Sequence, residues 1–480
     1  MDLRGKPVHQ MVEAVSSKEV SAYQLIEKTL ENCALVNEAL NIFSVIAGVD
    51  ALEQARAIDK RLEVGENLPL AGIPVAVKDD IFYGVLPTGL GSAAFKEFIP
   101  PYTATAVERL MDAGAIVIGK TNIGDMGLGS STVSSPNGPT VNPWDAGYAA
   151  GSAGAAAVIT GLCMLALESD TGGALRQGAS HCGVAGLRPG MGRVSRYGLN
   201  ADSSSFAQVG VTALSGDDIL CALEVISGPD GRDASLAAED KWAAGGRVAP
   251  DLQSESLTIG YPAAAFDLPE PEIREVYEKA RERYQAGGYR LTEIDLGLLP
   301  EALRAYYVIC LAETSSNHAR FDGIRFGRAA EAGDLEELYA KSRRLTLGPE
   351  ARRCSIFGTY ILGKGHYDRY YRQALKIWNL VRREFNRVLK ECDLLMLPVV
   401  KAAPVRLDEE ANFLENWGAD LFTAPVSMAG LPAISLPAGQ VGKMPVGLQL
   451  VGRPFSEKLL TAVCDRLAPE NKLFPHRGPS

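Results

Sequence analysis

The pattern of apolar and polar residues along the first quarter of the chain predicts helices and buried strands that follow one another in alternation. Apolar side chains at roughly helical spacing predict an amphipathic helix over 8–33 and a second helix over 50–64. Short apolar runs predict buried strands at 71–78 and 115–119, and a helical pattern over 103–113 separates them. Because helices and buried strands alternate, we expect an α/β fold with a mixed, largely parallel central sheet covered by helices.

The pattern changes in the middle of the chain. Residues 151–167 are nearly all alanine, glycine and small apolar residues, and a helix without a polar face is predicted to lie inside the protein. A polar, glycine-rich stretch at 228–256 then predicts a linker. It divides a single domain over 1–480 into a core portion, 1–227, and a second portion, 257–480. In the second portion we expect a strand at 257–260 and helices at 272–286 and 366–392.

Length, composition and charge narrow the class of protein. A chain of 480 residues, 46% hydrophobic and 22% charged, has ordinary globular values. The net charge of −10, without a lysine or arginine run, gives no signal for nucleic acid or an anionic membrane. Eight scattered cysteines and five histidines show no metal-ligand spacing. We therefore expect a cytoplasmic protein that has no metal, no cofactor and no membrane segment.

The most informative chemistry lies in the glycine loop of ESDTGGALRQ, residues 168–177. Thr171, Gly172 and Gly173 can turn backbone N–H groups toward a developing negative charge, as an oxyanion hole does. Such a loop needs an attacking atom beside it, but the next residue is Ala174. The loop therefore predicts an acyl-transfer site whose nucleophile position has been substituted.

Motifs along nearly the whole chain resemble the amidase-signature family, and within it the A subunits of tRNA-dependent amidotransferases. The matching blocks include LAGIPVAVKDDI (70–81), GSSTVSSPNGPTVNPWD (129–145), ESDTGGALRQGASHCGVAGLRPGMGRVSRYGL (168–199) and AGLPAISLPAGQVGKMPVGLQLVGRPFSEKLL (429–460). The resemblance implies an α/β/α domain and a Ser–cis-Ser–Lys relay. In that relay a neutral lysine takes a proton through a middle serine from a second serine, which attacks an amide carbonyl.

Carried over to this sequence, the relay is incomplete. The lysine is Lys78 and the nucleophile position is Ala174. Counting back from the glycine loop puts the middle serine at Ala150, whereas the local sequence pattern puts it at Ser152. Asp80 stands where the family usually has asparagine, and a carboxylate near the lysine would favour its charged form and oppose its use as a base.

The resemblance also implies a substrate side. A Gly-Ser-Ser loop, here Gly129, Ser130 and Ser131, holds the amide. The glutamine-using branch adds an aromatic residue, an arginine and an aspartate, for which the matches are Tyr306 or Tyr307, Arg353 and Asp420. An arginine and an aspartate together suit the two charges of an α-amino acid. The register of the arginine pair leaves open whether Cys354 takes the binding position.

Two functional hypotheses follow. In the first, the protein has lost serine-based amide hydrolysis, and it binds a small amide or amino acid or supports a partner subunit. In the second, it remains a working amidase or amidotransferase component that uses a displaced residue such as Ser152 or Ser180. Expected partners are a small amide or amino-acid ligand, and amidotransferase-type subunits or further copies of the chain. A laboratory substitution is disfavoured, because the positions around Ala174 also depart from the family.

Overall fold

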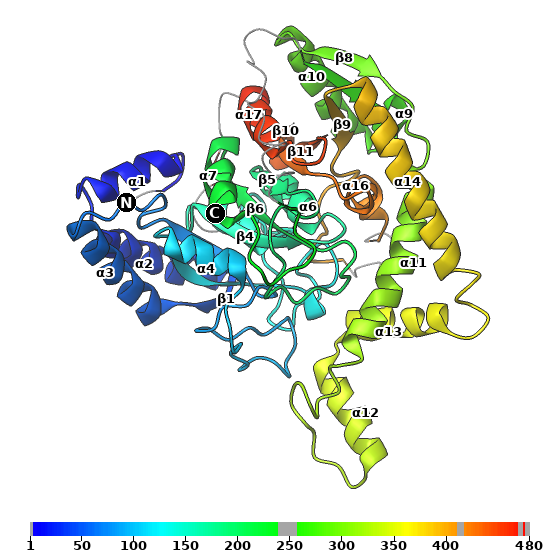
Figure 1. Ribbon diagram of the computed structural model, residues 1–480, viewed down its shortest axis with the longest axis horizontal. Coiled ribbons are helices and arrows are strands. Elements are labelled where there is room, and N and C mark those ends of the chain that lie inside the picture. Colours follow the sequence, from blue (N-terminus) through cyan, green and yellow to red (C-terminus); the bar gives the residue numbers. More distant parts are fainter. Residues whose placement is uncertain (1–2, 239–256, 410–416, 469–473, 476–480) are drawn as a thin grey trace.

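A single large sheet organises the molecule (Figure 1). The computed structural model describes residues 3–238, 257–409, 417–468 and 474–475. Its sheet has eleven strands in these residues. In spatial order they are β1 (Phe43–Ile46), β3 (Ile116–Thr121), β2 (Pro74–Lys78), β4 (Leu165–Asp170), β6 (Gln208–Ala213), β5 (Ala185–Arg188), β10 (Ala433–Val441), β11 (Met444–Val451), β9 (Leu394–Pro398), β7 (Thr258–Tyr261) and β8 (Arg290–Glu293).

The sheet is mixed, as expected, but it is not largely parallel. Four neighbouring pairs of described strands are parallel and six are antiparallel. The parallel pairs lie near the two ends, around β2 and around β7, where helices connect the strands. The centre is antiparallel because β10 and β11 form a tight hairpin beside β5. The helix-and-strand alternation that suggested a parallel sheet holds only for the first part of the chain.

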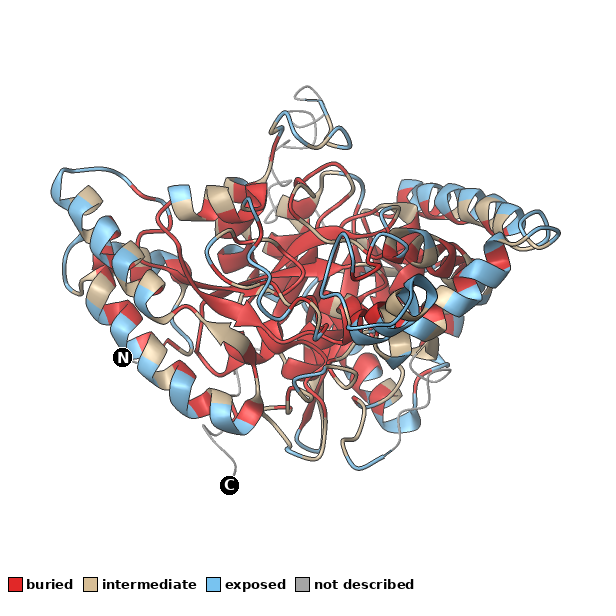
Figure 2. Cartoon of the chain, turned by 90° about the horizontal axis from the view of Figure 1, so that it is seen from below, coloured by how far each residue is buried: buried red, intermediate tan, exposed pale blue. Residues whose placement is uncertain are grey.

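Helices cover both faces of the sheet, so that the sheet is the middle one of three layers. The N-terminal and central helices are α1 (Val8–Ser16), α2 (Ala22–Leu40), α3 (Gly48–Glu63), α4 (Thr105–Asp112), α5 (Ala153–Ile159), α6 (Ala174–Cys182) and α7 (Gly216–Ile226). Helices α5 and α6 pack together against β4, whereas α7 and α17 (Glu457–Leu467) pack together over β6 and β10. Figure 2 shows the strands buried between helices whose outer faces are exposed.

The second half of the chain adds an outer group of helices beside this core. They are α9 (Ala263–Phe266), α10 (Pro271–Ala286), α11 (Leu299–His318), α12 (Leu335–Thr346), α13 (Pro349–Leu362), α14 (Tyr371–Glu391) and α16 (Ala424–Ala429), with the 3-10 turn η2 (Ala419–Leu421). The other 3-10 turn, η1 (Asp125–Gly127), belongs to the first half of the chain. Helix α11 packs along α13 and α14, and the α12 segment projects away from the body (Figure 1). No helix in the described ranges is long and apolar enough to cross a membrane.

Two helix predictions are corrected. The predicted helix over 8–33 is two helices, because the chain turns at Lys18, which has φ +65°, and restarts where Ser21 caps α2 in a capping box. The predicted helix over 151–167 is only seven residues long and then becomes β4. Every residue of α5 and β4 is buried, so the apolar run reflected burial of two different elements.

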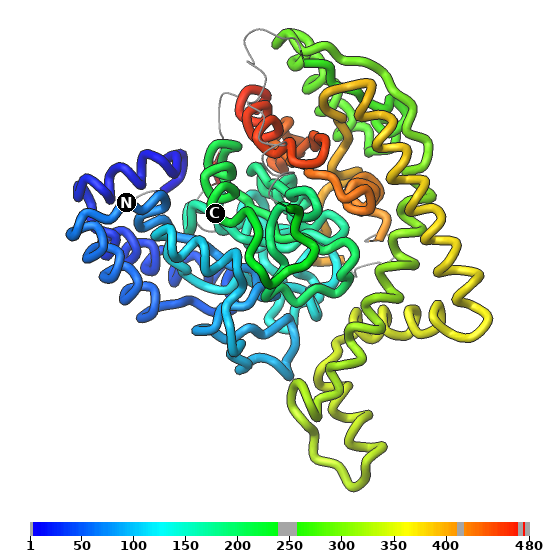
Figure 3. Tube along the Cα trace, viewed as in Figure 1, coloured from blue at the N-terminus to red at the C-terminus, as the bar shows by residue number. Residues whose placement is uncertain are grey.

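The two portions of the chain share the sheet. Figure 3 follows the chain from the N-terminal helices through the central strands and back, so that the late strand β10 pairs with the early strand β5. Residues 239–256 of the predicted linker lie outside the described residues. The division at 228–256 therefore stays a prediction.

Candidate functional site

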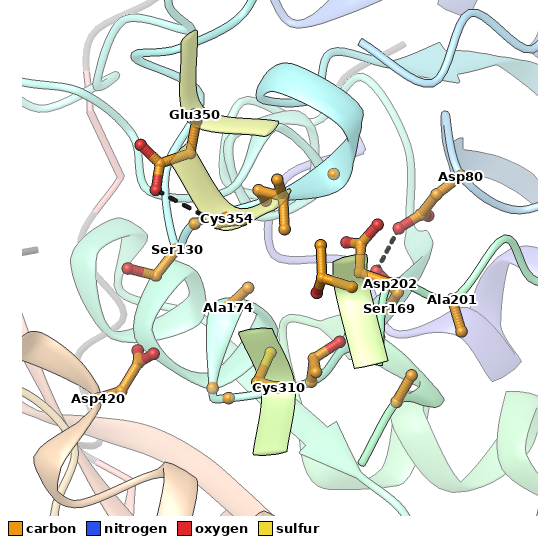
Figure 4. Close-up of a pocket in the computed structure, with 18 of the residues that line it drawn as sticks. Asp80, Ser130, Ser169, Ala174, Ala201, Asp202, Cys310, Glu350, Cys354 and Asp420 are labelled. Carbon is orange, nitrogen blue, oxygen red and sulfur yellow. Dashed lines mark hydrogen bonds between the residues drawn. The ribbon is translucent and has the colours of Figure 1, made fainter. Parts of the chain in front are cut away.

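The candidate site lies where β2 and β4 end side by side. These strands are parallel, with Val77 opposite Leu167, so Lys78 at the end of β2 reaches the last residues of β4. The glycine loop follows β4 directly, and α6 begins at Ala174. A pocket with a cavity volume of about 70 Å³ is lined by Lys78, by this loop and by residues of α11 and α13. Figure 4 shows Ala174 in this pocket with Cys310 of α11 and Cys354 of α13.

Lys78 is bound to a serine and a carboxylate that are not its expected relay partners. Its ammonium donates to Ser169 Oγ at 2.7 Å and lies 3.7 Å from Asp80 Oδ2. The Ser169 hydroxyl in turn donates to Asp80 Oδ2 at 2.5 Å. The structure confirms that Asp80 lies beside the lysine. The contacts of Lys78 are therefore with Ser169 and Asp80, and not with a serine at either predicted relay position.

Ala174 lines the pocket at the start of α6, beside the loop of Thr171, Gly172 and Gly173. Gly173 has φ +137°, and a Cβ there would collide with Thr423. A Cβ on Gly172 would lie 2.5 Å from the Tyr306 hydroxyl oxygen and 2.8 Å from Asp420 Oδ2. Both glycines are therefore needed for the loop to approach the opposite wall closely. The methyl group of Ala174 offers no nucleophile.

Neither candidate for the middle serine contacts Lys78. Ser152 lies with Lys78 and Ala174 along a small second cavity, but its hydroxyl donates to Glu168 Oε1 and accepts from the Ala155 N–H, which caps α5. Ala150 is buried, and its carbonyl accepts from the Cys182 thiol. Every peptide bond in the described residues is trans, so the cis bond that the resemblance implied is not formed there.

Glu168, Gly154 and Gly178 pack around Ser152. Burial raises the pKa of the Glu168 carboxyl, which accepts from Ser152 and, at 2.6 Å, from the Thr212 hydroxyl. A Cβ on Gly154 would lie only 2.6 Å from the carboxyl carbon of Glu168, which is too close for the two to coexist without a shift. A Cβ on Gly178 would collide with Ser152. The departures from the family around Ala174 therefore fit one another as a packed cluster.

The opposite wall of the pocket holds the expected substrate-side aspartate. Asp420 Oδ2 accepts from the Tyr307 hydroxyl at 2.6 Å, and Oδ1 accepts from Gln177 Nε2 at 2.7 Å. Burial raises the pKa of Asp420 to about 6. Tyr306 and Tyr307 both line the pocket from α11, and the ring of Trp417 stacks on Tyr307 with centroids 4.6 Å apart.

The expected arginine does not line this pocket. The Arg353 guanidinium forms an ion pair with Glu350 one turn earlier on α13, and it lines an adjoining cavity. Cys354 takes the position that faces the pocket. In the glycine–serine loop, Gly129 and Ser130 line the pocket, whereas Ser131 lines only the cavities next to it.

Sequence reasoning missed several pocket groups. Asp202 lines the wall near Asp80 and lies 3.2 Å from His318 Nε2, and burial raises the pKa of its carboxyl. Its loop carries no motif that would have singled it out. Trp417 lies three residues before Asp420 and could have been noticed as an aromatic neighbour of that candidate. Among the described residues, no group of three or more His, Cys, Asp or Glu side chains is arranged to hold a metal ion.

The fold and the glycine-loop site together define the class of protein. The family model described as Amidase matches residues 24–461, and the chain belongs to the amidase family.

Within this family, the chain resembles the A subunits of amidotransferases. It is 37% identical over 490 residues to the A subunit of the glutamyl-tRNA(Gln) amidotransferase of Natranaerobius thermophilus, covering 100% of this chain and 99% of the relative. The corresponding protein of Symbiobacterium thermophilum is 41% identical over 446 residues, covering 92% and 91%.

Solved structures agree with this assignment. The crystal structure of the corresponding amidotransferase protein from Thermotoga maritima superposes with a TM-score of 0.79 and 29% identity, covering 99% of this chain and 98% of that one. A 6-aminohexanoate cyclic dimer hydrolase complexed with its substrate superposes with a TM-score of 0.83 and 26% identity, covering 99% of both chains.

Proposed function

We propose that this amidase-family protein has lost serine-based amide hydrolysis and acts by binding a small amide or amino acid in the pocket. The observation that carries the proposal is the alanine methyl group of Ala174 beside the glycine loop. In serine hydrolases, removal of the nucleophile costs on the order of 10⁶ in turnover, and only binding and the oxyanion hole remain. The pocket keeps the loop and the buried aspartate that such binding would use.

The surroundings of Lys78 support the same proposal. A relay needs a lysine that can accept a proton through a serine aimed at the nucleophile. Here the ammonium is 3.7 Å from the Asp80 carboxylate, and the Ser152 hydroxyl donates to Glu168. Restoring a serine at position 174 would therefore place a hydroxyl in the pocket without a base to activate it.

An active amidase is the second candidate, and one contact favours it. Ser169 lines the pocket and hydrogen-bonds Lys78 Nζ at 2.7 Å, which is the pairing of a nucleophile with a base. The two other displaced serines have less support. Ser152 is held by Glu168, and Ser180 is buried where its hydroxyl accepts from the Gly447 N–H at 2.7 Å.

Support of partner subunits is the other part of the proposed role. The relatives in Natranaerobius and Symbiobacterium carry the name of an amidotransferase component, and the match covers nearly their whole length. A protein of this shape would bind amidotransferase-type companions even without its own hydrolysis.

Ammonia release tests the proposal. Purified protein incubated with glutamine, asparagine and a simple aryl amide is expected to release no ammonia above the rate of a heat-denatured sample. Ala174→Ser is expected to remain inactive, because Lys78 stays bound to Ser169 and Asp80. Ammonia release by the natural chain that disappears in Ser169→Ala would contradict the proposal and establish the second candidate.

A further inference from the structure

The wall around Asp420 combines a buried carboxylate with aromatic rings. The two hydrogen bonds to this carboxylate come from the neutral donors Tyr307 and Gln177, so no hydrogen-bonded cation balances its charge. The ring of Tyr306 lies nearly perpendicular to that of Tyr307, with centroids 5.1 Å apart, and the ring of Trp417 stacks on Tyr307. A carboxylate bordered by aromatic faces suits an organic cation, which gains both ionic and cation–π attraction.

The same pocket offers no cation for a ligand carboxylate. Among its described lining residues no arginine is present, and the lysine is Lys78. Its ammonium is already bound by Ser169 and Asp80. Arg353 lies in the adjoining cavity with its guanidinium on Glu350. The α13 side chains that line the pocket are Glu350 and the uncharged Cys354.

Further carboxylates line the pocket at a distance from Asp420. Asp80 and Asp202 lie on the far side of Ala174 from Asp420, and Glu350 lies at a third side (Figure 4). Asp80 is 5% exposed, and its Oδ1 atom has no hydrogen-bond partner although it is buried. A ligand carboxylate would meet these groups without a partner of its own, and burying an unpaired charge is costly.

We propose that the ligand of this pocket is a small cationic amine that carries no carboxylate, with its ammonium on Asp420 and the surrounding aromatic rings. This inference rests on the proposed function and narrows it, because it excludes the free amino acids. The Asp80 carboxylate and the Ser130 hydroxyl also line the pocket and are polar groups for the amide of such a molecule. The preference arises from Cys354 at the position where an arginine would bind a carboxylate.

Three probes that differ by one group test the inference. Glutamine carries an amine, a carboxylate and an amide. 4-Aminobutanamide lacks only the carboxylate, and glutaramic acid lacks only the amine. Isothermal titration calorimetry at pH 7.5 is expected to give 4-aminobutanamide a Kd at least tenfold below that of glutamine, with glutaramic acid the weakest. Glutamine binding as tightly as 4-aminobutanamide, or no binding of 4-aminobutanamide, would overturn the inference.

Two substitutions test which residues cause the preference for an amine without a carboxylate. Asp420→Asn is expected to weaken 4-aminobutanamide binding at least tenfold, and Cys354→Arg is expected to tighten glutamine binding at least tenfold by supplying the missing cation. If Arg353→Ala instead weakens glutamine binding in the natural background, Arg353 already binds a carboxylate and the inference is wrong. The thermal midpoint of each variant shows that it is folded.

The probes also separate the two proposals. Glutamine that binds best without ammonia release would contradict the amine inference and leave the proposed function standing. Ammonia released from any probe would contradict the proposed loss of hydrolysis, whichever probe binds best.

Discussion

The two walls of the pocket differ in how far they keep the residues that the family resemblance predicts. On the catalytic wall, formed by Lys78, Ser169 and Ala174, the hydroxyl group contacts a carboxylate and the nucleophile position carries a methyl group. On the binding wall, formed by Asp420 and Tyr307, a buried carboxylate is held by neutral donors beside open space. One wall has no hydroxyl at the nucleophile position, whereas the other has a buried carboxylate that lines the pocket.

The difference teaches that chemistry and recognition can be altered separately within one pocket. On the catalytic side, the absence of a side chain at Gly154 leaves room for Glu168, and its absence at Gly178 leaves room for Ser152. The Glu168 carboxyl accepts from both Ser152 and Thr212. Several residues of that side therefore depend on one another for packing. The side chains of the binding side come mainly from α11 and η2, and Gln177 of α6 joins them by donating to Asp420.

The largest effect is expected where one residue supports both walls. Arg176 on α6 is fully buried, pairs with Asp170 of β4 at 3.0 Å, and donates to Gln449 and Ser427 behind the binding wall. Arg176→Met leaves the Asp170 charge less compensated, and breaking a buried pair costs about 3–5 kcal/mol. Urea denaturation should show this loss in the free energy of unfolding, together with loss of ligand binding.

A surface arginine provides the control. Arg387 pairs with Glu391 on the exposed side of α14, where its side chain is 48% exposed. Arg387→Met is expected to change the free energy of unfolding by less than about 1 kcal/mol. Equal losses in the two variants would mean that Arg176 does not join the two walls.

Much of the scaffold was predictable because burial leaves a strong periodic signal. The helices α3, α4, α10 and α14 and the strand β3 lie close to their predicted ranges. The strand directions at the centre were not predictable, since pairing of β10 with β5 joins residues that are far apart in sequence. The apolar run over 151–167 shows where prediction from periodicity fails, because complete burial removes the periodicity that distinguishes a helix from a strand.

The site was predictable at the residues that a motif anchors. Lys78, Ala174 and Asp420 all line the pocket, and Asp80 lies in contact with Lys78. The motif could not show which of Arg353 and Cys354 faces inward, because helix phase decides that and neighbouring residues point in different directions. It also could not show that Glu168 would bind Ser152, since that contact depends on space left by glycines elsewhere.

A substitution at Ser152 tests whether the residues behind the catalytic wall act in packing only. The Ser152 hydroxyl caps helix α5 and hydrogen-bonds the Glu168 carboxyl. Ser152→Ala removes the α5 cap and leaves a buried Glu168 oxygen without its donor. A lost cap and an unsatisfied buried acceptor together are expected to lower the free energy of unfolding by about 2–3 kcal/mol. The affinity for 4-aminobutanamide should not change, because Ser152 does not line the ligand pocket.

Ser215→Ala is the matched control for that variant. Ser215 caps α7 by accepting from the Asp218 N–H at 3.2 Å and has no buried carboxylate to satisfy. Its loss is expected to cost about 1 kcal/mol. If Ser152→Ala weakens ligand binding while leaving stability unchanged, Ser152 belongs to the functional site and the separation of the walls is wrong.

The smallest expected effect is the change of ligand affinity with pH, which depends on the binding wall alone. Burial raises the pKa of Asp420 to about 6 in the folded protein, so its carboxylate becomes protonated as the pH falls through that value. An amine ligand needs the ionised form, and its affinity should therefore be constant above about pH 7 and about tenfold lower at pH 5. Titration calorimetry of 4-aminobutanamide from pH 5 to pH 8 measures this. Asp420→Asn, which cannot ionise, should bind weakly and without this pH dependence. A natural protein whose affinity stays constant down to pH 5 would show that the ammonium does not bind at Asp420.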